Sequence, residues 1–184
     1  MLMSPREDMA AALACGLAVD VVRTFGEVRL RVFGISMAPS ILPGDLISVQ
    51  RAAMSEISSG EIVMYVREGR MFAHRVVRRT GTSEHSLLII RGDRLRHNDP
   101  PVSSNELLGK VISIERGKFQ WRPAPSLSGW ERVIVRLLEH SDRATYLYSR
   151  LVTLRFVGGR HAARLQASDT NECHQSPGRA ECRV

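Results

Sequence analysis

Polar and apolar residues alternate along the middle of this chain in short runs. In residues 27–33, charged side chains alternate with Val28, Leu30 and Val32, which is the two-residue period of a strand with one buried face. Similar β-rich runs follow at residues 46–51, 61–67, 70–79, 87–91, 109–115 and 118–122. The Glu68-Gly69 pair between two of these runs is typical of a tight hairpin turn. We therefore predict a mainly β fold of the α+β class, a coiled and largely antiparallel sheet or barrel of about seven strands.

Helical periodicity replaces this alternation at both ends of the chain. Residues 5–24 predict an amphipathic helix with Glu7 and Asp8 in its first turn. After Pro125, apolar residues recur at helical spacing on both sides of a break near Ser141: Trp130, Val133, Ile134, Leu137, Leu138, Leu147, Leu151 and Leu154. We divide the chain into an N-terminal amphipathic helix (1–26), a β domain (27–122), a basic helical hairpin (123–165) and a disordered polar tail (166–184).

The distribution of charge adds a candidate binding surface. The 184 residues suit one domain with appendages, and a hydrophobic content of 43% is enough for a core. The net charge is +7, and residues 122–164 alone carry eight arginines against Glu131, Glu139 and Asp142, a net charge of +5. Such a segment suits nucleic acid, an anionic membrane surface or an acidic partner, or it is a solvated arginine-rich face.

The apolar run near the amino terminus is too short to cross a membrane. It covers residues 9–19, which are 11 residues that end before Asp20. A spanning helix needs about 20 apolar residues, and the segment lacks the basic start and the cleavage site of a signal peptide. We therefore expect a cytoplasmic or peripheral membrane protein without a transmembrane segment or signal peptide.

The cysteines indicate neither a metal site nor a disulfide framework. Cys15 lies in an apolar helical pattern and is expected in the core. Cys173, His174 and Cys182 provide three ligands, which is fewer than the four of a structural zinc site. We expect no metal and no cofactor.

The first candidate for chemistry is Ser36, in a turn that has Gly34 before the serine and Pro39, Pro43 and Gly44 after it. Such a turn can hold a hydroxyl exposed and fixed, although turns rich in serine, proline and glycine are common. Serine at its free pKa is a poor nucleophile and needs a neighbouring base to remove its proton. Ser36 is therefore either a nucleophile or a turn serine whose hydroxyl bonds nearby backbone.

Two later segments offer a base and carboxylates that could orient it. His74 lies mid-strand in Phe72-Ala73-His74-Arg75-Val76, and alternation along the strand points Arg75 to the other face. Asp93 follows Gly92, and Asp99 comes six residues later. A carboxylate can fix the tautomer of a histidine base and stabilise its charged form. The alternatives are a satisfied core histidine and two turn aspartates, and for one of the aspartates the turn role is expected.

In this order, the three segments resemble the catalytic boxes of the type I signal peptidases and of their relatives, the LexA-type self-cleaving proteins, over roughly residues 27–116. Bacterial signal peptidases usually carry a lysine base. His74 with Asp93 and Asp99 is instead similar to the histidine-type signal peptidases of the endoplasmic reticulum, although we expect no membrane anchor of their kind here. The resemblance implies the β fold of that superfamily, with Ser36 as nucleophile, His74 as general base, Asp99 as the direct partner of the histidine and Asp93 close by.

The resemblance also implies how a substrate would be held. The backbone N–H of Ser36 is the expected oxyanion donor. Gly34 stands where many signal peptidases have a second donor, a serine hydroxyl, and it resembles the LexA-type pattern Gly-x-Ser-Met. Together with Gly34, Met37 and Pro39 are expected to shape a substrate-binding groove. Because histidine starts near pKa 6.5 and lysine near 10.4, a histidine base depends less on burial, which suits a version without an anchor.

The leading hypothesis is a serine endopeptidase that cuts a precursor or leader peptide after a small residue such as alanine. One alternative is a LexA-type self-cleaving regulator, which is disfavoured because only 26 residues precede the first strand and no Ala-Gly dipeptide occurs. The other alternative is a non-catalytic peptide-binding barrel. We expect no nucleic-acid partner, and a peripheral membrane contact through the basic hairpin stays open.

Overall fold

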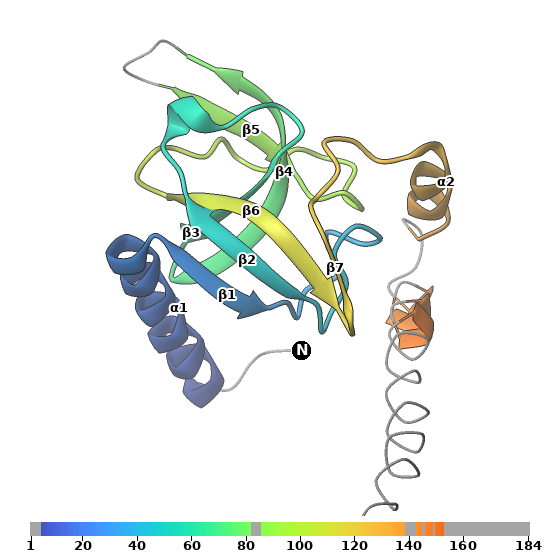
Figure 1. Ribbon diagram of the computed structural model, residues 1–184, viewed down its shortest axis with the longest axis horizontal. Helices are drawn as coiled ribbons and strands as arrows, with labels where there is room; N and C mark the ends of the chain where they lie inside the picture. Colours follow the sequence, from blue (N-terminus) through green and yellow to red (C-terminus); the bar gives the residue numbers. More distant parts are fainter. Residues whose placement is uncertain (1–4, 82–85, 139–142, 145, 149, 153–184) are drawn as a thin grey trace, which may run out of the picture.

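The computed structural model describes residues 5–81, 86–138, 143, 144, 146–148 and 150–152, and its centre is one antiparallel sheet (Figure 1). The seven strands are β1 (Glu27–Arg31), β2 (Leu46–Arg51), β3 (Ile62–Arg67), β4 (Arg70–Thr80), β5 (Leu87–Arg91), β6 (Leu107–Arg116) and β7 (Phe119–Trp121). They pair in the order β1-β2-β6-β3-β4-β5, with β7 on β6, and the described sheet does not close into a barrel. The predicted fold class is confirmed.

The strand boundaries follow the sequence pattern closely, and the turn between β3 and β4 fixes the register. Glu68 and Gly69 both have positive φ angles, of 52° and 70°, as a two-residue hairpin turn with the twist of the sheet requires. Arg67 therefore pairs with Arg70, and Val63 pairs with His74. Strand β1 ends at Arg31, earlier than predicted, although the N–H of Val32 still donates to the carbonyl of Asp45 at 2.9 Å.

Alternating residues of β3 enter two different hydrophobic clusters, as the two-residue period of a strand dictates. Ile62 and Met64 belong to the larger cluster, which also contains Met37, Ile41, Ile47, Val49, Leu108, Val111 and Ile114. Val63 and Tyr65 belong to the smaller one, with Ile57, Val76, Leu88, Ile90 and Val102. The sheet is thus packed on both faces, and β3 and β4 lie between the two clusters.

Helix α1 (Pro5–Phe25) covers one side of the sheet and packs on β1 and β2. Cys15, Ala18 and Val22 are buried there, which confirms the predicted core position of the cysteine. A short 3-10 turn, η1 (Met54–Glu56), follows β2. Among the described residues, no helix is long and apolar enough to span a membrane.

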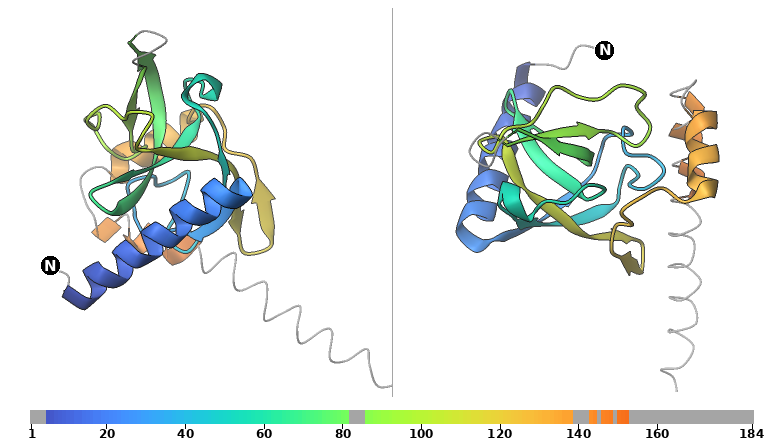
Figure 2. Two further views of the ribbon diagram at one scale, coloured as in Figure 1. Left: turned by 90° about the vertical axis from the view of Figure 1, so that its left-hand side faces the viewer. Right: turned by 90° about the horizontal axis from the view of Figure 1, so that it is seen from above.

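The second helix, α2 (Gly129–Leu138), lies on the opposite side of the molecule from α1 (Figures 1 and 2). The described residues from 143 to 152 are helical too. Leu138 packs with Ala38 and Leu42, which follow Ser36 in the connection between β1 and β2, and Ile134, Tyr148 and Val152 pack against this group. The C-terminal helical segment therefore lies against the turn that carries Ser36. Leu154 and the predicted tail (166–184) lie outside the described residues.

Candidate active site

Ser36 lies in the connection between β1 and β2, and this connection is held by a buried carboxylate. Asp45 is 2% exposed and accepts a hydrogen bond from the N–H of Leu42 at 2.8 Å. Arg116 of β6 binds both oxygens of the same carboxylate, at 2.8 and 2.6 Å. Asp45 thus holds the turn and also binds it to β6 of the sheet.

His74 lies in the middle of β4, with its side chain on the face of the smaller cluster. The residue is 4% exposed, and its Nε2 lies 3.0 Å from Oγ of Ser36. The rings of Tyr65 and Phe72 lie 6.1 and 6.4 Å from the imidazole, centroid to centroid, and form an aromatic wall beside it. A hydroxyl and an imidazole that are 38 positions apart in sequence are thus in hydrogen-bonding contact.

Asp99 completes this line of contacts on the other side of the imidazole. Its Oδ2 lies 2.5 Å from Nδ1 of His74. The backbone N–H of Asp99 donates to the carbonyl of Ile90 at 2.9 Å, which returns the loop after β5 to the strand it left. An Nδ1–H that donates to Asp99 leaves Nε2 unprotonated and facing the Ser36 hydroxyl, which is the tautomer that a general base needs.

The loop between β5 and Asp99 also contacts the turn that carries Ser36, through backbone atoms of both segments. The N–H of Arg94 donates to the carbonyl of Ser36 at 3.0 Å. A Cβ at position 92 would lie 2.8 Å from the same carbonyl oxygen, so Gly92 is required by this close approach. One loop therefore positions both the carboxylate and the serine.

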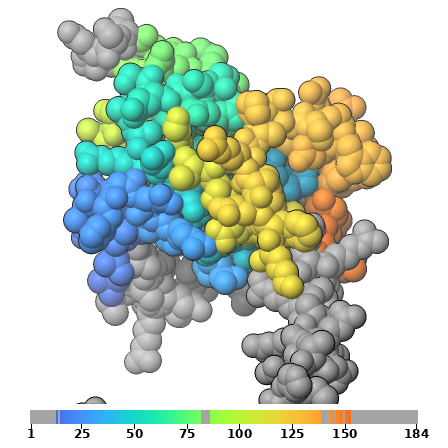
Figure 3. All heavy atoms as spheres, in the orientation of Figure 1, coloured from blue at the N-terminus to red at the C-terminus, as the bar shows by residue number. Residues whose placement is uncertain are grey.

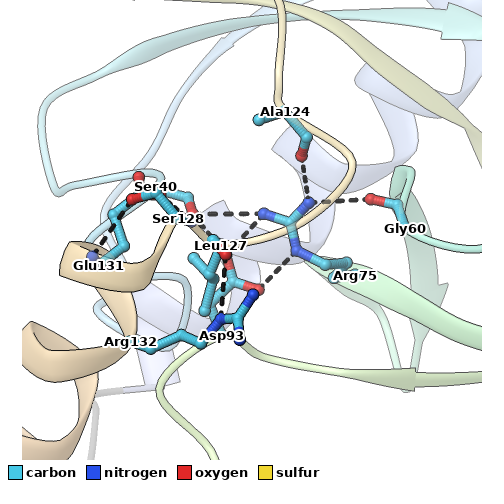
Figure 4. A network of polar contacts seen from close by, with 9 residues as sticks. All are labelled: Ser40, Gly60, Arg75, Asp93, Ala124, Leu127, Ser128, Glu131 and Arg132. Carbon is cyan, nitrogen blue, oxygen red and sulfur yellow. Dashed lines mark hydrogen bonds and ion pairs between the residues drawn. The ribbon is translucent and has the colours of Figure 1, made fainter.

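Asp93 lies in the same loop but takes part in a different network (Figure 4). Arg75 donates to its two oxygens from Nε and Nη2, at 2.7 and 2.8 Å, and the hydroxyl of Ser40 donates to it at 2.6 Å. In addition, Nη1 of Arg75 donates to the carbonyls of Gly60 and Ala124, at 2.8 and 2.6 Å. Asp93 thus ties β4 to the serine turn, and among the described residues its carboxylate has no hydrogen bond to His74.

A third ion pair holds the chain just beyond Asp99. Arg67 donates to Glu106 at 2.7 Å and to the carbonyls of Pro100 and Pro101, at 3.2 and 2.9 Å. The hydrogen bond from Arg67 lowers the pKa of Glu106 to about 2. Burial first, and the charge of Asp99 second, raise the pKa of Tyr65 to about 12, so this phenol stays neutral beside the imidazole.

The three residues expected at a substrate groove differ in their exposure. Gly34 is exposed, and a Cβ built there meets no atom within 4 Å. Met37 and Pro39 are both buried, and Met37 packs in the larger hydrophobic cluster. Gly34 thus lies at the surface beside Ser36, whereas the other two support the turn from inside. His97, which lies between Asp93 and Asp99 in the chain, is exposed.

Tyr65 and Ser40 belong to the surroundings of the site but were not among the residues predicted for it. The position of Tyr65 could have been predicted, because the turn at Glu68-Gly69 pairs Tyr65 with Phe72 and so places it near His74. Ser40 gave no such signal, since its partner Asp93 is 53 positions away and lies in an irregular loop.

A family model described as Peptidase S24-like matches residues 17–110, about half of the chain and all of the segments that hold Ser36, His74, Asp93 and Asp99. The chain belongs to the Peptidase S24-like family. The predicted resemblance to the LexA and signal peptidase superfamily is therefore confirmed, and it associates the chain with serine peptidases. A comparison with curated proteins gives no match. Because the family also has non-catalytic members, activity has to be argued from the site.

Proposed function

We propose that this protein is a serine endopeptidase in which Ser36 is the nucleophile, His74 the general base and Asp99 the residue that orients the base. The observation that carries the proposal is the continuous line of contacts, 2.5 Å from Asp99 to His74 and 3.0 Å from His74 to Ser36. A nucleophile, a base and a carboxylate that are linked in this order by hydrogen bonds form the arrangement used in nucleophilic acyl transfer.

The reaction would proceed in two halves. Nε2 of His74 takes the proton from Ser36 as Oγ attacks the carbonyl carbon of the peptide, and Asp99 stabilises the imidazolium that forms. His74 then gives this proton to the leaving amine, the C–N bond breaks, and an acyl-enzyme remains on Ser36. In the second half a water gives its proton to His74 and attacks the ester, which releases the new carboxyl end and restores the serine.

The oxyanion of each tetrahedral intermediate requires donors. The N–H of Ser36 is one candidate, since within the described part of the chain no carbonyl or side chain accepts a hydrogen bond from it. Gly34 has no side chain that could act as a second donor. Because one such donor is worth about 10²–10³ in rate, we expect slow turnover.

The open edge of β4 supports a peptide as the substrate. Strand β5 pairs with β4 from Arg75 onward, so among the described strands residues 70–74 are paired on the β3 side alone. An extended peptide can add to such an edge as a further strand, through main-chain hydrogen bonds, and would run directly past His74. By resemblance, the cut would follow a small residue such as alanine in a precursor or leader peptide.

The test is cleavage of a mixture of unfolded peptides, read by mass spectrometry, with the wild-type protein and Ser36→Ala. We expect the cleavage rate of the variant to fall by about 10⁶, which is the loss seen in enzymes whose serine and histidine act as one unit. Its thermal stability should be unchanged. Ser40→Ala is the matched control, because Ser40 lies in the same turn but contacts Asp93, and it should retain cleavage. Cleavage by neither protein would favour the non-catalytic binding barrel, and equal cleavage by wild type and Ser36→Ala would show that Ser36 is not the nucleophile.

A further inference from the structure

Helix α2 has an apolar stripe that faces away from the protein. Trp130 is 74% exposed and Leu137 is 71% exposed, with Val133 between them. These residues are spaced i, i+3 and i+7 and so lie on one face of the helix. The neighbouring face, with Ile134, Val135 and Leu138, is half-buried or buried. Folding therefore accounts for one apolar face of α2 and leaves the other uncovered among the described residues.

The helical residues after α2 repeat this arrangement. Tyr148 and Val152 pack against the group formed by Ala38, Leu42 and Leu138, whereas Leu147 and Leu151 are exposed. Both exposed stripes belong to one segment, which we call the C-terminal helical face: Trp130, Val133, Leu137, Leu147 and Leu151. In the space-filling view α2 stands out as a lobe on one side of the molecule (Figure 3).

Arginines border this face. Arg132 and Arg136, four residues apart on α2, line a cavity of about 920 Å³ that is also lined by Arg91 and Arg96. Further along, Arg143 and Arg150 are exposed. The acidic Glu131 is already engaged at the start of α2, where it accepts from the N–H and the hydroxyl of Ser128, at 2.7 and 2.8 Å. The cavity and the helices thus present positive charge beside exposed tryptophan and leucine.

We propose that the C-terminal helical face docks on the surface of an anionic lipid bilayer. Apolar residues with a tryptophan beside a band of arginines fit the boundary between acyl chains and anionic headgroups. The net charge of +5 in residues 122–164 complements such a surface. Nucleic acid would use the arginines but would leave the exposed leucines in water, so the bilayer accounts for both features.

This docking would place the candidate active site at the membrane. The buried face of the same segment packs on Ala38 and Leu42, in the connection that carries Ser36. A bilayer on the outer face would thus lie one helix layer away from that turn. Peptides presented at the membrane surface would then be the accessible substrates. The docking itself does not depend on catalysis.

The test uses the full chain with Trp121→Phe, which leaves Trp130 as the remaining tryptophan of the two in the sequence. Vesicles of phosphatidylcholine mixed with phosphatidylglycerol should shift the Trp130 emission to the blue, and brominated acyl chains should quench it. Vesicles of phosphatidylcholine alone should give much weaker binding. Adding Ser36→Ala should leave binding unchanged, which separates this proposal from the proposed catalysis.

Matched variants locate the surface. Leu137→Gln with Leu147→Gln should weaken vesicle binding by about tenfold for each leucine. Leu13→Gln with Leu17→Gln, an equally exposed pair on α1, should leave it unchanged. Arg150→Gln should weaken it roughly fivefold, and Arg78→Gln on β4 should not. Circular dichroism checks that each variant is folded.

Three results would overturn the proposal. One is the absence of an emission shift with anionic vesicles. Another is an equal loss of binding in both leucine pairs. The third is a dimer in sedimentation, or a complex with duplex DNA, that Leu137→Gln with Leu147→Gln abolishes while vesicles do not bind the wild type; the face would then serve a second copy or nucleic acid.

Discussion

His74 and Arg75 are neighbours in β4, yet they build different polar clusters on opposite faces of the strand. His74 contacts Ser36 and Asp99, in a line of three groups that ends at a half-buried hydroxyl. Arg75 has hydrogen bonds to Asp93, Ser40 and two carbonyls, and the Asp93 side chain is 3% exposed. In the first cluster the serine hydroxyl can pass its proton to the imidazole. In the second cluster the charged groups are paired with each other.

Strand β4 and the loop after β5 each contribute one polar residue to each of these two clusters. Asp93 and Asp99 both come from the loop after β5, but only Asp99 among them reaches the imidazole in the described structure. We infer that the histidine face performs chemistry and that the arginine face keeps the serine turn in place. Substitutions on the two faces should therefore affect different measurements.

Among substitutions that separate the two faces, we expect Asp99→Asn to have the largest effect, which is on the cleavage rate. An amide at this position would favour the wrong imidazole tautomer, so we expect cleavage to fall by about 10⁴ while the fold stays intact. Cleavage rates and a denaturant titration on the same preparation check both parts. Asp93→Asn is the matched control, and a loss of cleavage as large as that of Asp99→Asn, without a loss of stability, would show that the division between the two aspartates is wrong.

The next effect concerns stability. Arg75→Met leaves the buried Asp93 carboxylate without its charged partner, so we expect the free energy of unfolding to fall by about 3–5 kcal/mol. Urea denaturation measures this change. Arg75→Met combined with Asp93→Leu removes both charges and should recover part of the loss. A single variant as stable as wild type would mean that this ion pair does not hold the turn.

Much of the separation between the histidine face and the arginine face of β4 could be predicted from the sequence. The alternation along residues 70–79 placed His74 and Arg75 on opposite faces, and the Glu68-Gly69 turn fixed the register of β3 and β4 because both residues adopt left-handed conformations. The residue pattern alone did not decide between Asp93 and Asp99, for which only the family resemblance favoured Asp99, since the loop between them is irregular and its path depends on long-range contacts such as that of Arg94 with Ser36.

The C-terminal segment illustrates a second limit. Helical spacing of Trp130, Val133 and Leu137 predicted a helix, but spacing alone does not tell which of two apolar faces packs on the protein. That depends on Ala38 and Leu42, which lie almost 100 positions earlier in the chain. The burial of Met37 could not be predicted for a similar reason, because the strands that cover this residue come later in the chain.

A smaller effect is expected at Ser40, which belongs to the arginine face. Ser40→Ala removes one hydrogen bond to Asp93, which should cost about 1–3 kcal/mol of stability because the acceptor is charged. Thermal unfolding measures this loss, and Ser126→Ala, at an exposed position, serves as the control. A drop in cleavage by orders of magnitude would show that Ser40 belongs to the histidine face instead.

The smallest effect is a pH-dependent one at Glu106. Because the pKa of Glu106 is lowered to about 2 in the folded protein, the stabilisation by Arg67 is complete above the ordinary glutamate pKa of about 4.3 and is lost as the pH falls toward 2. Both side chains are about a quarter exposed, so we expect Glu106→Gln to cost about 0.2–1 kcal/mol at neutral pH. Melting curves from neutral to acidic pH should show this difference vanish, and a difference that is constant with pH would contradict the assignment.

Covalent trapping tests the central claim most directly. A fluorophosphonate should form a single adduct on Ser36, identified by mass spectrometry of the labelled peptide, and His74→Ala should abolish it because the serine would lose its base. Labelling of a different serine, or labelling of Ser36 that is equally fast without His74, would contradict the account.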